Sequence, residues 1–251
     1  MTAGEDRAEA ALAAARHLLA ERFPEAGCGF ASGSIMRGQG TPTSDIDFVV
    51  VHRRVDRGWR ESLTWEGFPV EVWAHDPETL AWFMEKDAES GWPIMAHVVA
   101  TGRPIGPDAE LAAMVRERAE AVLAKGPPSL DSEFGRSLRY IVTALLEDLD
   151  DAPDDAARRA VVAMLYQPLA DLMLIGRGQW SGKGKWVPRL LRACDPALAE
   201  AFDAGVRDAS AGDARPLLAL GESELTRHGG RYFDGDKRLA PREARLKLSD
   251  P

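Results

Sequence analysis

Two carboxylates, Asp45 and Asp47, open an apolar run at residues 45–51 with the sequence DIDFVVV. Successive side chains of a β-strand point to opposite faces, so a strand here places both carboxylates on one face and the alternate apolar residues on the other. Two carboxylates held a few ångströms apart repel each other unless a cation lies between them. Because carboxylate oxygens are hard ligands that suit Mg²⁺, the spacing predicts a magnesium site at the start of this strand.

A third carboxylate, Glu71, interrupts the apolar segment FPVEVWA at residues 68–74. This segment and residues 63–65 predict a β-hairpin across the dipeptide Glu66-Gly67. A carboxylate in such a strand needs a partner or a metal. Adjacent strands lie about 4.8 Å apart, so Glu71 joins the two aspartates if its strand neighbours theirs. It would then complete the ligand set or take a proton from an attacking hydroxyl. The alternative is a solvated strand edge with scattered acids.

A Gly-Ser turn, Gly33-Ser34, follows a short strand expected at residues 28–32. Glycine lets a backbone approach a ligand closely, and N–H groups at the start of a helical turn favour phosphate oxygens. The serine hydroxyl adds one hydrogen bond, and Ser44 lies in a polar loop just before the carboxylates. The alternative interpretation is that these residues serve turn geometry alone.

A glycine-rich loop, GRGQWSGKGK at residues 176–185, carries Lys183 and Lys185 between Trp180 and Trp186. A lysine can neutralise a triphosphate, and an indole can stack on a base or on a sugar face. An ordinary interhelical loop with solvated lysines explains the pattern equally well. Lys185 is the favoured nucleotide contact.

The patterns around these residues change at the connector GRPIGP, residues 102–107. Before it, helices are expected at 5–22 and 76–89, and residues 92–101 fit a helix or a strand. After it, every segment predicts helix, and Pro168 is expected to kink one of them. These helices are expected at 108–125, 131–149, 156–175, 186–193, 196–208 and 216–227. We therefore expect two domains, residues 1–106 and 107–228, and a polar tail at 229–251.

The composition of the 251-residue chain limits its partners. A net charge of −9 and a pI near 5.2 argue against broad binding to nucleic acid and favour a cationic small substrate. The acidic run EDLDDAPDD at residues 147–155 fits a solvated helix end or a negative wall facing such a substrate. Cys28 and Cys194 fit no metal spacing, so buried reduced thiols are expected.

The N-terminal residues are acidic at their start and predict an amphipathic helix rather than a signal peptide. No stretch approaches the apolar length that spans a bilayer. We therefore expect a cytoplasmic protein without a membrane partner.

The whole motif resembles one known family. The pattern GS-x-x-x-G followed by SDID runs from Gly33 through Gly38 to Asp47. It is similar to that of the nucleotidyltransferase superfamily that includes DNA polymerase β, in which a later strand carries a third carboxylate; Glu71 is the match here. The resemblance is strong over residues 27–75. Beyond them it is one of layout, because small-molecule members such as aminoglycoside nucleotidyltransferases carry a helical C-terminal domain.

The resemblance implies an α+β fold, with a small mixed-sheet nucleotidyltransferase domain followed by an all-α helical bundle. It implies two Mg²⁺ ions, with ATP or another NTP as the co-substrate. The implied metal ligands and catalytic residues are Asp45, Asp47 and Glu71. The implied nucleotide contacts are Gly33, Ser34, Arg37, Ser44 and Lys185. Many relatives have a basic residue directly after Gly-Ser; here that position is Ile35, and Arg37 would supply the charge.

The expected activity is Mg²⁺-dependent transfer of a nucleoside monophosphate, AMP from ATP in the favoured case, to a hydroxyl of a small molecule. An aminoglycoside is the most economical acceptor given the acidic charge and the family layout, and such an activity would confer antibiotic resistance. One alternative keeps the chemistry but uses a protein or RNA acceptor, as antitoxin-like members do. The other is a nucleotide-binding or partner-binding module without catalysis.

Overall fold

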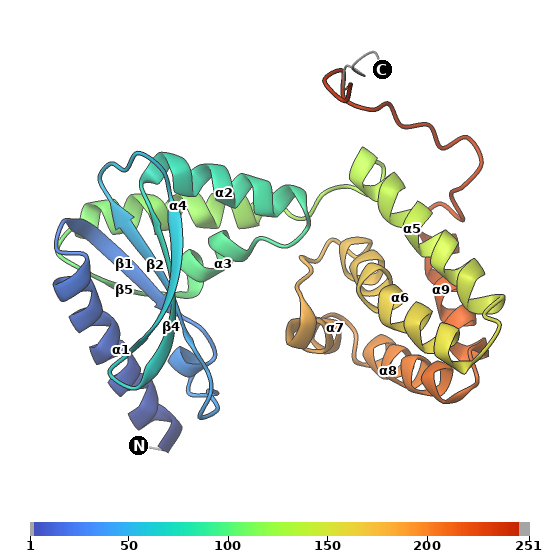
Figure 1. The fold of residues 1–251 in the computed structure, drawn as a ribbon, viewed down its shortest axis with the longest axis horizontal. Helices are drawn as coiled ribbons and strands as arrows, with labels where there is room; N and C mark the ends of the chain where they lie inside the picture. The colour runs from blue at the N-terminus through green and yellow to red at the C-terminus, as the bar shows by residue number, and fades with distance from the viewer. Residues whose placement is uncertain (1–2, 246–251) are drawn as a thin grey trace, which may run out of the picture. The chain divides into compact units, whose positions relative to one another are not determined.

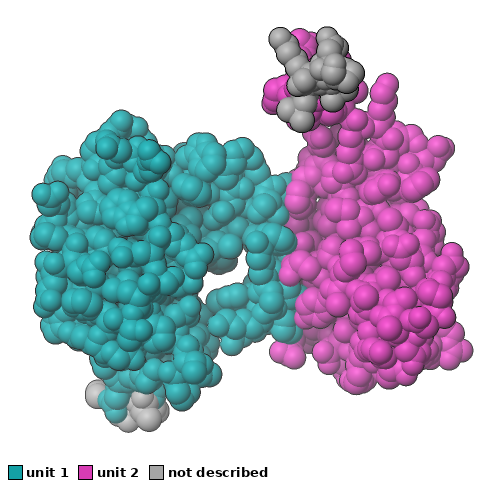
Figure 2. All heavy atoms as spheres, in the orientation of Figure 1, with its two compact units in different colours: residues 1–128, 177–190 teal, residues 129–176, 191–251 magenta. Residues whose placement is uncertain are grey.

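The computed structural model describes residues 3–245 and divides into two compact units, coloured separately in Figure 2. The first unit contains residues 1–128 and 177–190, and the second contains residues 129–176 and 191–251. The fold is α+β: the first unit is built on a mixed sheet, and the second is helical (Figure 1). Within residues 3–245, no helix combines the length and the apolar character needed to cross a membrane.

A five-stranded sheet with the order β3-β4-β2-β1-β5 forms the centre of the first unit. Strand β2 runs parallel to β4, and the other neighbouring pairs are antiparallel. The strands are β1 (Ala26–Ser32), β2 (Ile46–His52), β3 (Trp59–Trp65), β4 (Phe68–His75) and β5 (Arg103–Ile105).

Helices cover both faces of this sheet, so β2 is buried on both sides. Helix α1 (Ala3–Arg22) packs on one face, in a core that contains the alternate residues Ile46, Phe48 and Val50. The other face carries Val49 and Val51 and is covered by three helices. These are α2 (Pro77–Glu89), α3 (Ile94–Thr101) and α4 (Ala109–Ala124). Asp45 and Asp47 therefore lie where β2 begins, on the face that α2 to α4 cover farther along the strand.

The predicted hairpin and the predicted start of helix α2 are confirmed. Glu66 and Gly67 join β3 to β4, and both have positive φ angles, as a tight hairpin turn requires. The Asp76 side chain accepts a hydrogen bond from the Thr79 backbone N–H at 2.8 Å, and Pro77 occupies the first helical turn.

Three segments differ from the sequence expectations or go beyond them. Residues 94–101 form helix α3, which settles the choice between helix and strand. The expected connector contains β5, whose short backbone pairs with β1 at the edge of the sheet. Strand β3 begins at Trp59, four residues before the hairpin arm expected at residues 63–65. Both strand assignments depend on pairing with a distant partner, which a local pattern does not reveal.

The second unit consists of helices that pack on one another, notably α5 on α6 and α8 on α9. Pro168 lies inside α6, and the kink expected there remains a prediction. Its helices are α5 (Glu133–Asp150), α6 (Asp155–Ile175), α8 (Pro196–Ala211) and α9 (Arg215–Arg227).

The units differ from the division expected at residue 106. Helix α4 packs against α3 and β1 and buries Val115, Ala119 and Val122 in the core beneath the sheet, so it belongs to the first unit. The segment 177–190 also belongs to the first unit, although both of its flanks belong to the second. This segment contains the short helix η2 (Gly184–Trp186) and the first residues of α7 (Val187–Cys194).

Candidate functional site

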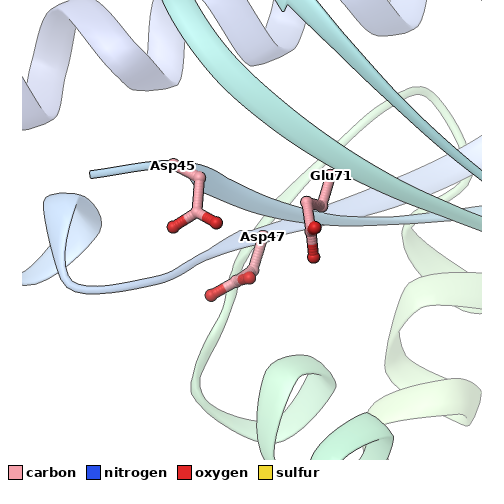
Figure 3. Close-up of side chains that lie close together, drawn as sticks. All are labelled: Asp45, Asp47 and Glu71. Atoms are coloured by element: carbon pink, nitrogen blue, oxygen red, sulfur yellow. The ribbon is translucent and has the colours of Figure 1, made fainter. Parts of the chain in front are cut away.

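Three carboxylates from two neighbouring strands meet at one place. Strands β2 and β4 are parallel neighbours whose register sets Asp47 beside Glu71, and Asp45 directly precedes β2. One carboxylate oxygen from each residue lies within 4.8 Å of the other two. Figure 3 shows the three side chains together on the same side of the strands. The structure thus brings together the residues that the sequence singled out.

The carboxylates strongly influence one another. Burial and the charges of Asp45 and Glu71 raise the pKa of Asp47 from 3.8 to about 6, while Lys185 and Arg37 oppose the rise. The cost of keeping Asp47 ionised is thus set by its two acidic neighbours as well as by the low polarity around it. A bound cation would remove this cost.

The donor set fits a hard divalent cation. All three groups offer carboxylate oxygens, they are half-buried, and their separations allow one ion to contact all of them. Mg²⁺ is such a cation and is commonly held by one or two carboxylates together with substrate phosphates. Asp45, Asp47 and Glu71 are therefore the residues that would hold it.

Glu71 also has a protein partner that the sequence did not suggest. The Arg60 guanidinium donates to the Glu71 carboxylate at 2.7 Å. Arg60 lies opposite Trp73 in the β3–β4 pair, and Trp73 is on the same face as Glu71 because the two are two residues apart. Arg60 thus reaches Glu71 diagonally and holds one of its oxygens.

Gly33 is required by the position of the Asp47 carboxylate. Its φ angle is +104°, a conformation that L side chains rarely adopt. A Cβ atom at this position would lie 3.1 Å from the Asp45 carbonyl oxygen and 3.1 Å from Asp47 Oδ2. Glycine at position 33 therefore lets the turn that follows β1 pass directly against the three carboxylates.

The side chains of Ser34 and Ser44 are hydrogen-bonded to each other. The Ser34 hydroxyl donates to Ser44 Oγ at 3.1 Å, and the Thr41 backbone N–H donates to the same oxygen at 2.8 Å. Ser44 is buried. These bonds join the Gly-Ser turn to the loop that leads into Asp45. Contact of either serine with phosphate remains a prediction.

The short helix η1 (Ile35–Arg37) explains why position 35 is isoleucine here and not the basic residue expected directly after Gly-Ser. Ile35 is buried in the core beside α1, where a basic side chain would be costly. Arg37 is exposed, lines the same pocket as Asp47 and lies over the Trp186 ring at 5.1 Å from its centroid. Burial and nearby Arg189 lower the pKa of Arg37, and Asp47 raises it. Arg37 therefore supplies positive charge beside Asp47.

Hydrogen bonds fasten the segment 177–190 to the rest of the first unit. The Trp180 indole N–H donates to the Leu123 carbonyl at 3.0 Å, and the Ser181 backbone N–H donates to the Gly91 carbonyl at 3.0 Å. Trp180 thus anchors the segment through its indole N–H. Lys185 is close enough to Asp47 to lower its pKa.

A pocket of about 430 Å³ lies beside Asp47, entirely within the first unit. One part of its wall comes from β1, the Gly33 turn and Arg37, another from Trp92, Pro93 and one side of α3, and the third from the segment 177–190. Sequence reasoning missed the contribution of Trp92 and α3, because that segment carried no polar motif. The residues that line the pocket include Gly33, Arg37, Asp47, Trp92, Pro93, Ile94, His97, Val98, Lys183, Trp186 and Leu190.

The acidic run at residues 147–155 has structural roles. Its acidic residues are exposed at the end of α5 and the start of α6. Asp154 accepts a hydrogen bond from the Ala157 N–H and caps α6, and Glu147 pairs with Arg231 at 2.9 Å. These contacts favour the solvated helix end over the negative wall.

Residues 19–108 match a family model described as the nucleotidyltransferase domain. Among solved structures, the chain is similar to a nucleotidyltransferase-like protein from Exiguobacterium sibiricum 255-15, with 15% identity and a TM-score of 0.45; the match covers 86% of this chain and 76% of that one. No curated protein matches the sequence. The family match spans the five strands and the Gly-Ser turn, and it supports nucleotidyl transfer as the general chemistry of this unit.

Gly33→Ala tests the contact between the turn and the carboxylates. We expect it to weaken Mn²⁺ or Mg²⁺ binding in calorimetric titration, because the new methyl group displaces Asp47 Oδ2. Gly67→Ala is the matched control, because Gly67 also has positive φ but has open space around it. Both variants should lose about 1 kcal/mol of stability from backbone strain. Equal cation affinity in the two variants would contradict this role of Gly33.

Asp47→Asn tests the repulsion within the cluster. The raised pKa means that the folded chain keeps a proton that the unfolded chain releases, so stability falls as pH rises from 3.8 to 6, and the deficit is complete above that. At pH 7.5 without divalent cations, the free energy of unfolding of the variant should be about 1 to 3 kcal/mol higher than that of wild type, so the variant is the more stable protein. The gain should shrink at pH 4.5.

Urea unfolding at the two pH values measures this difference. Asp56→Asn is the control, because Asp56 is an exposed carboxylate in the β2–β3 loop. A gain in Asp47→Asn that is the same at both pH values would show that carboxylate repulsion is not its cause.

Proposed function

We propose that the protein is a Mg²⁺-dependent nucleotidyltransferase that moves a nucleoside monophosphate, AMP from ATP in the favoured case, to a hydroxyl of a small molecule. The observation that supports it most is the meeting of Asp45, Asp47 and Glu71 beside a pocket that also contains Gly33 and Arg37. The match of residues 19–108 to the nucleotidyltransferase domain supports the same chemistry.

Different residues around the three carboxylates would bind the metal ion and the triphosphate. Asp45 and Asp47 would hold Mg²⁺, which when bound neutralises phosphate charge. Arg37 and Lys185, whose charges already act on Asp47, would contact the triphosphate, and the Gly33-Ser34 turn and Ser44 would lie against it. Catalysis by such a site is mainly positioning and charge neutralisation.

The transfer exchanges one phosphorus–oxygen bond for another. The acceptor oxygen bonds to the α-phosphorus, the bond from that phosphorus to the bridging oxygen of the β-phosphate breaks, and pyrophosphate leaves. Glu71 would accept the hydroxyl proton as a general base or serve as the third metal ligand. In the structure Arg60 binds one oxygen of this carboxylate, Oε1, so the proton or the metal would go to the other oxygen.

The acceptor class follows from charge. A net charge of −9 favours a cationic, hydroxyl-bearing small molecule, and an aminoglycoside has these properties. The helical second unit would contribute to holding it. A cytoplasmic location accords with an intracellular NTP supply and belongs to this proposal. The alternatives are a protein or RNA acceptor and a nucleotide-binding module without catalysis.

Pyrophosphate release from ATP and Mg²⁺ with a panel of aminoglycosides tests the activity. Release with at least one aminoglycoside is expected, with Asp47→Asn inactive and Asp56→Asn active. Release only after a protein or RNA is added would support the first alternative. Measurable ATP binding with no release from any acceptor would contradict the enzyme proposal.

Glu71→Gln separates the two roles of that residue. A general base predicts a fall in kcat of about 100-fold or more with ATP and cation affinity nearly unchanged. A metal ligand predicts a fall in cation affinity as well. Arg60→Gln keeps the carboxylate and removes its partner, so its kcat should stay well above that of Glu71→Gln. Unchanged turnover in Glu71→Gln would remove Glu71 from the mechanism.

A further inference from the structure

We propose that the pocket beside Asp47 binds the nucleobase of the NTP, that the base stacks on the Trp186 indole, and that a purine is preferred. This inference rests on the proposed function and names the substrate class of the same site. It assigns the pocket to the nucleoside and leaves the acceptor to another surface.

The pocket has a polar part and an apolar part, as a nucleoside triphosphate does. The polar part contains Gly33, Arg37 and Asp47, and the phosphates would bind there. The remaining wall is largely apolar and aromatic, with Trp92, Pro93, Ile94, Val98, Trp186 and Leu190. The polar side chains of His97, Thr101, Ser181 and Lys183 also line it. Its volume of about 430 Å³ falls in the range of small-molecule sites. A flat, weakly polar ring system next to a polyanion matches this division.

Four cations border the same region: Arg37, Lys183, Lys185 and Arg189. Within residues 3–245 none of them forms a salt bridge with a carboxylate. Arg37 and Arg189 instead lie over the Trp186 ring, at 5.1 and 5.3 Å from its centroid, and Lys183 Nζ lies 4.1 Å from the Trp92 centroid. Asp47 lies near Arg37 and Lys185, and Asp87 lies near Lys183, so the four cations still exceed the carboxylates around them. Such an excess of positive charge favours a polyanionic ligand.

When the nucleotide binds, these cations can exchange their contacts with aromatic rings for contacts with phosphate oxygens. Phosphate oxygens offer a guanidinium charge-assisted hydrogen bonds, which are stronger than its contact with an exposed ring. When Arg37 turns to the triphosphate, a face of Trp186 becomes available for the base. Trp186 is 40% exposed and lies one residue from Lys185, so ring and phosphate contacts come from one short stretch.

The preference for a purine follows from the kind of contact. Stacking on an indole grows with the overlapping ring area, and a purine has two fused rings where a pyrimidine has one. Stacking carries little information about the base edge. The inference therefore ranks ATP and GTP above CTP and UTP and makes no choice between adenine and guanine.

Calorimetric titration with ATP, CTP and inorganic tripolyphosphate in the presence of Mg²⁺ tests the inference. Wild type should bind ATP more tightly than CTP and tripolyphosphate. Trp186→Ala and Trp186→Leu should weaken ATP binding roughly tenfold or more while leaving tripolyphosphate binding nearly unchanged. Trp186→Phe, which keeps a ring, should recover most of the ATP affinity. Trp82→Ala is the control, because Trp82 is 56% exposed on α2, is not a pocket residue and should have no effect.

The possible failures point to different conclusions. If wild type binds ATP no better than tripolyphosphate, or if the variants that lack a ring lose both ligands equally, the base does not stack on Trp186 and the proposed function still stands. If ATP and CTP bind equally, the purine preference is wrong. If wild type binds neither ATP nor tripolyphosphate, the proposed function itself fails. Melting temperatures of all variants show whether a loss comes from unfolding.

Discussion

Mutual repulsion of three carboxylates is the constraint on which the first unit depends. The backbones of Asp47 and Glu71 are fixed side by side because β2 and β4 are hydrogen-bonded neighbours in register, and Asp45 directly precedes β2. These backbones cannot separate without breaking that ladder. The chain tolerates the repulsion because Arg37, Lys185 and Arg60 bring positive charge to the cluster from three different elements.

The burial of β2 makes this fixation rigid. Ile46, Phe48 and Val50 pack into one core and Val49 and Val51 into the other, so neither face of the strand can shift. A slip of one residue would turn the carboxylates into a core. The start of the strand, where Asp45 and Asp47 lie, is where the helices on its second face leave room for a pocket.

The local part of this site could be predicted from the sequence, because its signals are local. Alternation placed Asp45 and Asp47 on one face, and the Glu66-Gly67 turn fixed a strand that carries Glu71. The resemblance to nucleotidyltransferases supplied the third carboxylate on a later strand, and its place beside the two aspartates was conditional on the strands being neighbours. The structure buries Ile35 and leaves Arg37 exposed near Asp47, and the role of Arg37 as a substitute for a basic residue at position 35 stays a prediction.

The parts that could not be predicted depend on contacts between distant segments. The Arg60–Glu71 ion pair follows from the β3–β4 register and an early start of β3. Strand β5 exists because β1 pairs with it. The pocket joins Trp92 to Trp186, which are far apart in the chain, and Trp180 proved to be an anchor because its indole reaches the Leu123 carbonyl.

The path of the chain also limits how the two units can be separated. It passes between them at residues 128–129, 176–177 and 190–191, so the sheet unit is discontinuous in sequence. A fragment that ends at Pro128 would keep the three carboxylates and lose Lys185 and Trp186. Recombination at that single junction would exchange the helices and the 177–190 segment together. The two units therefore cannot be exchanged at a single point in the sequence. A graft that replaces only the helical unit needs two further junctions, one before residue 177 and one after residue 190.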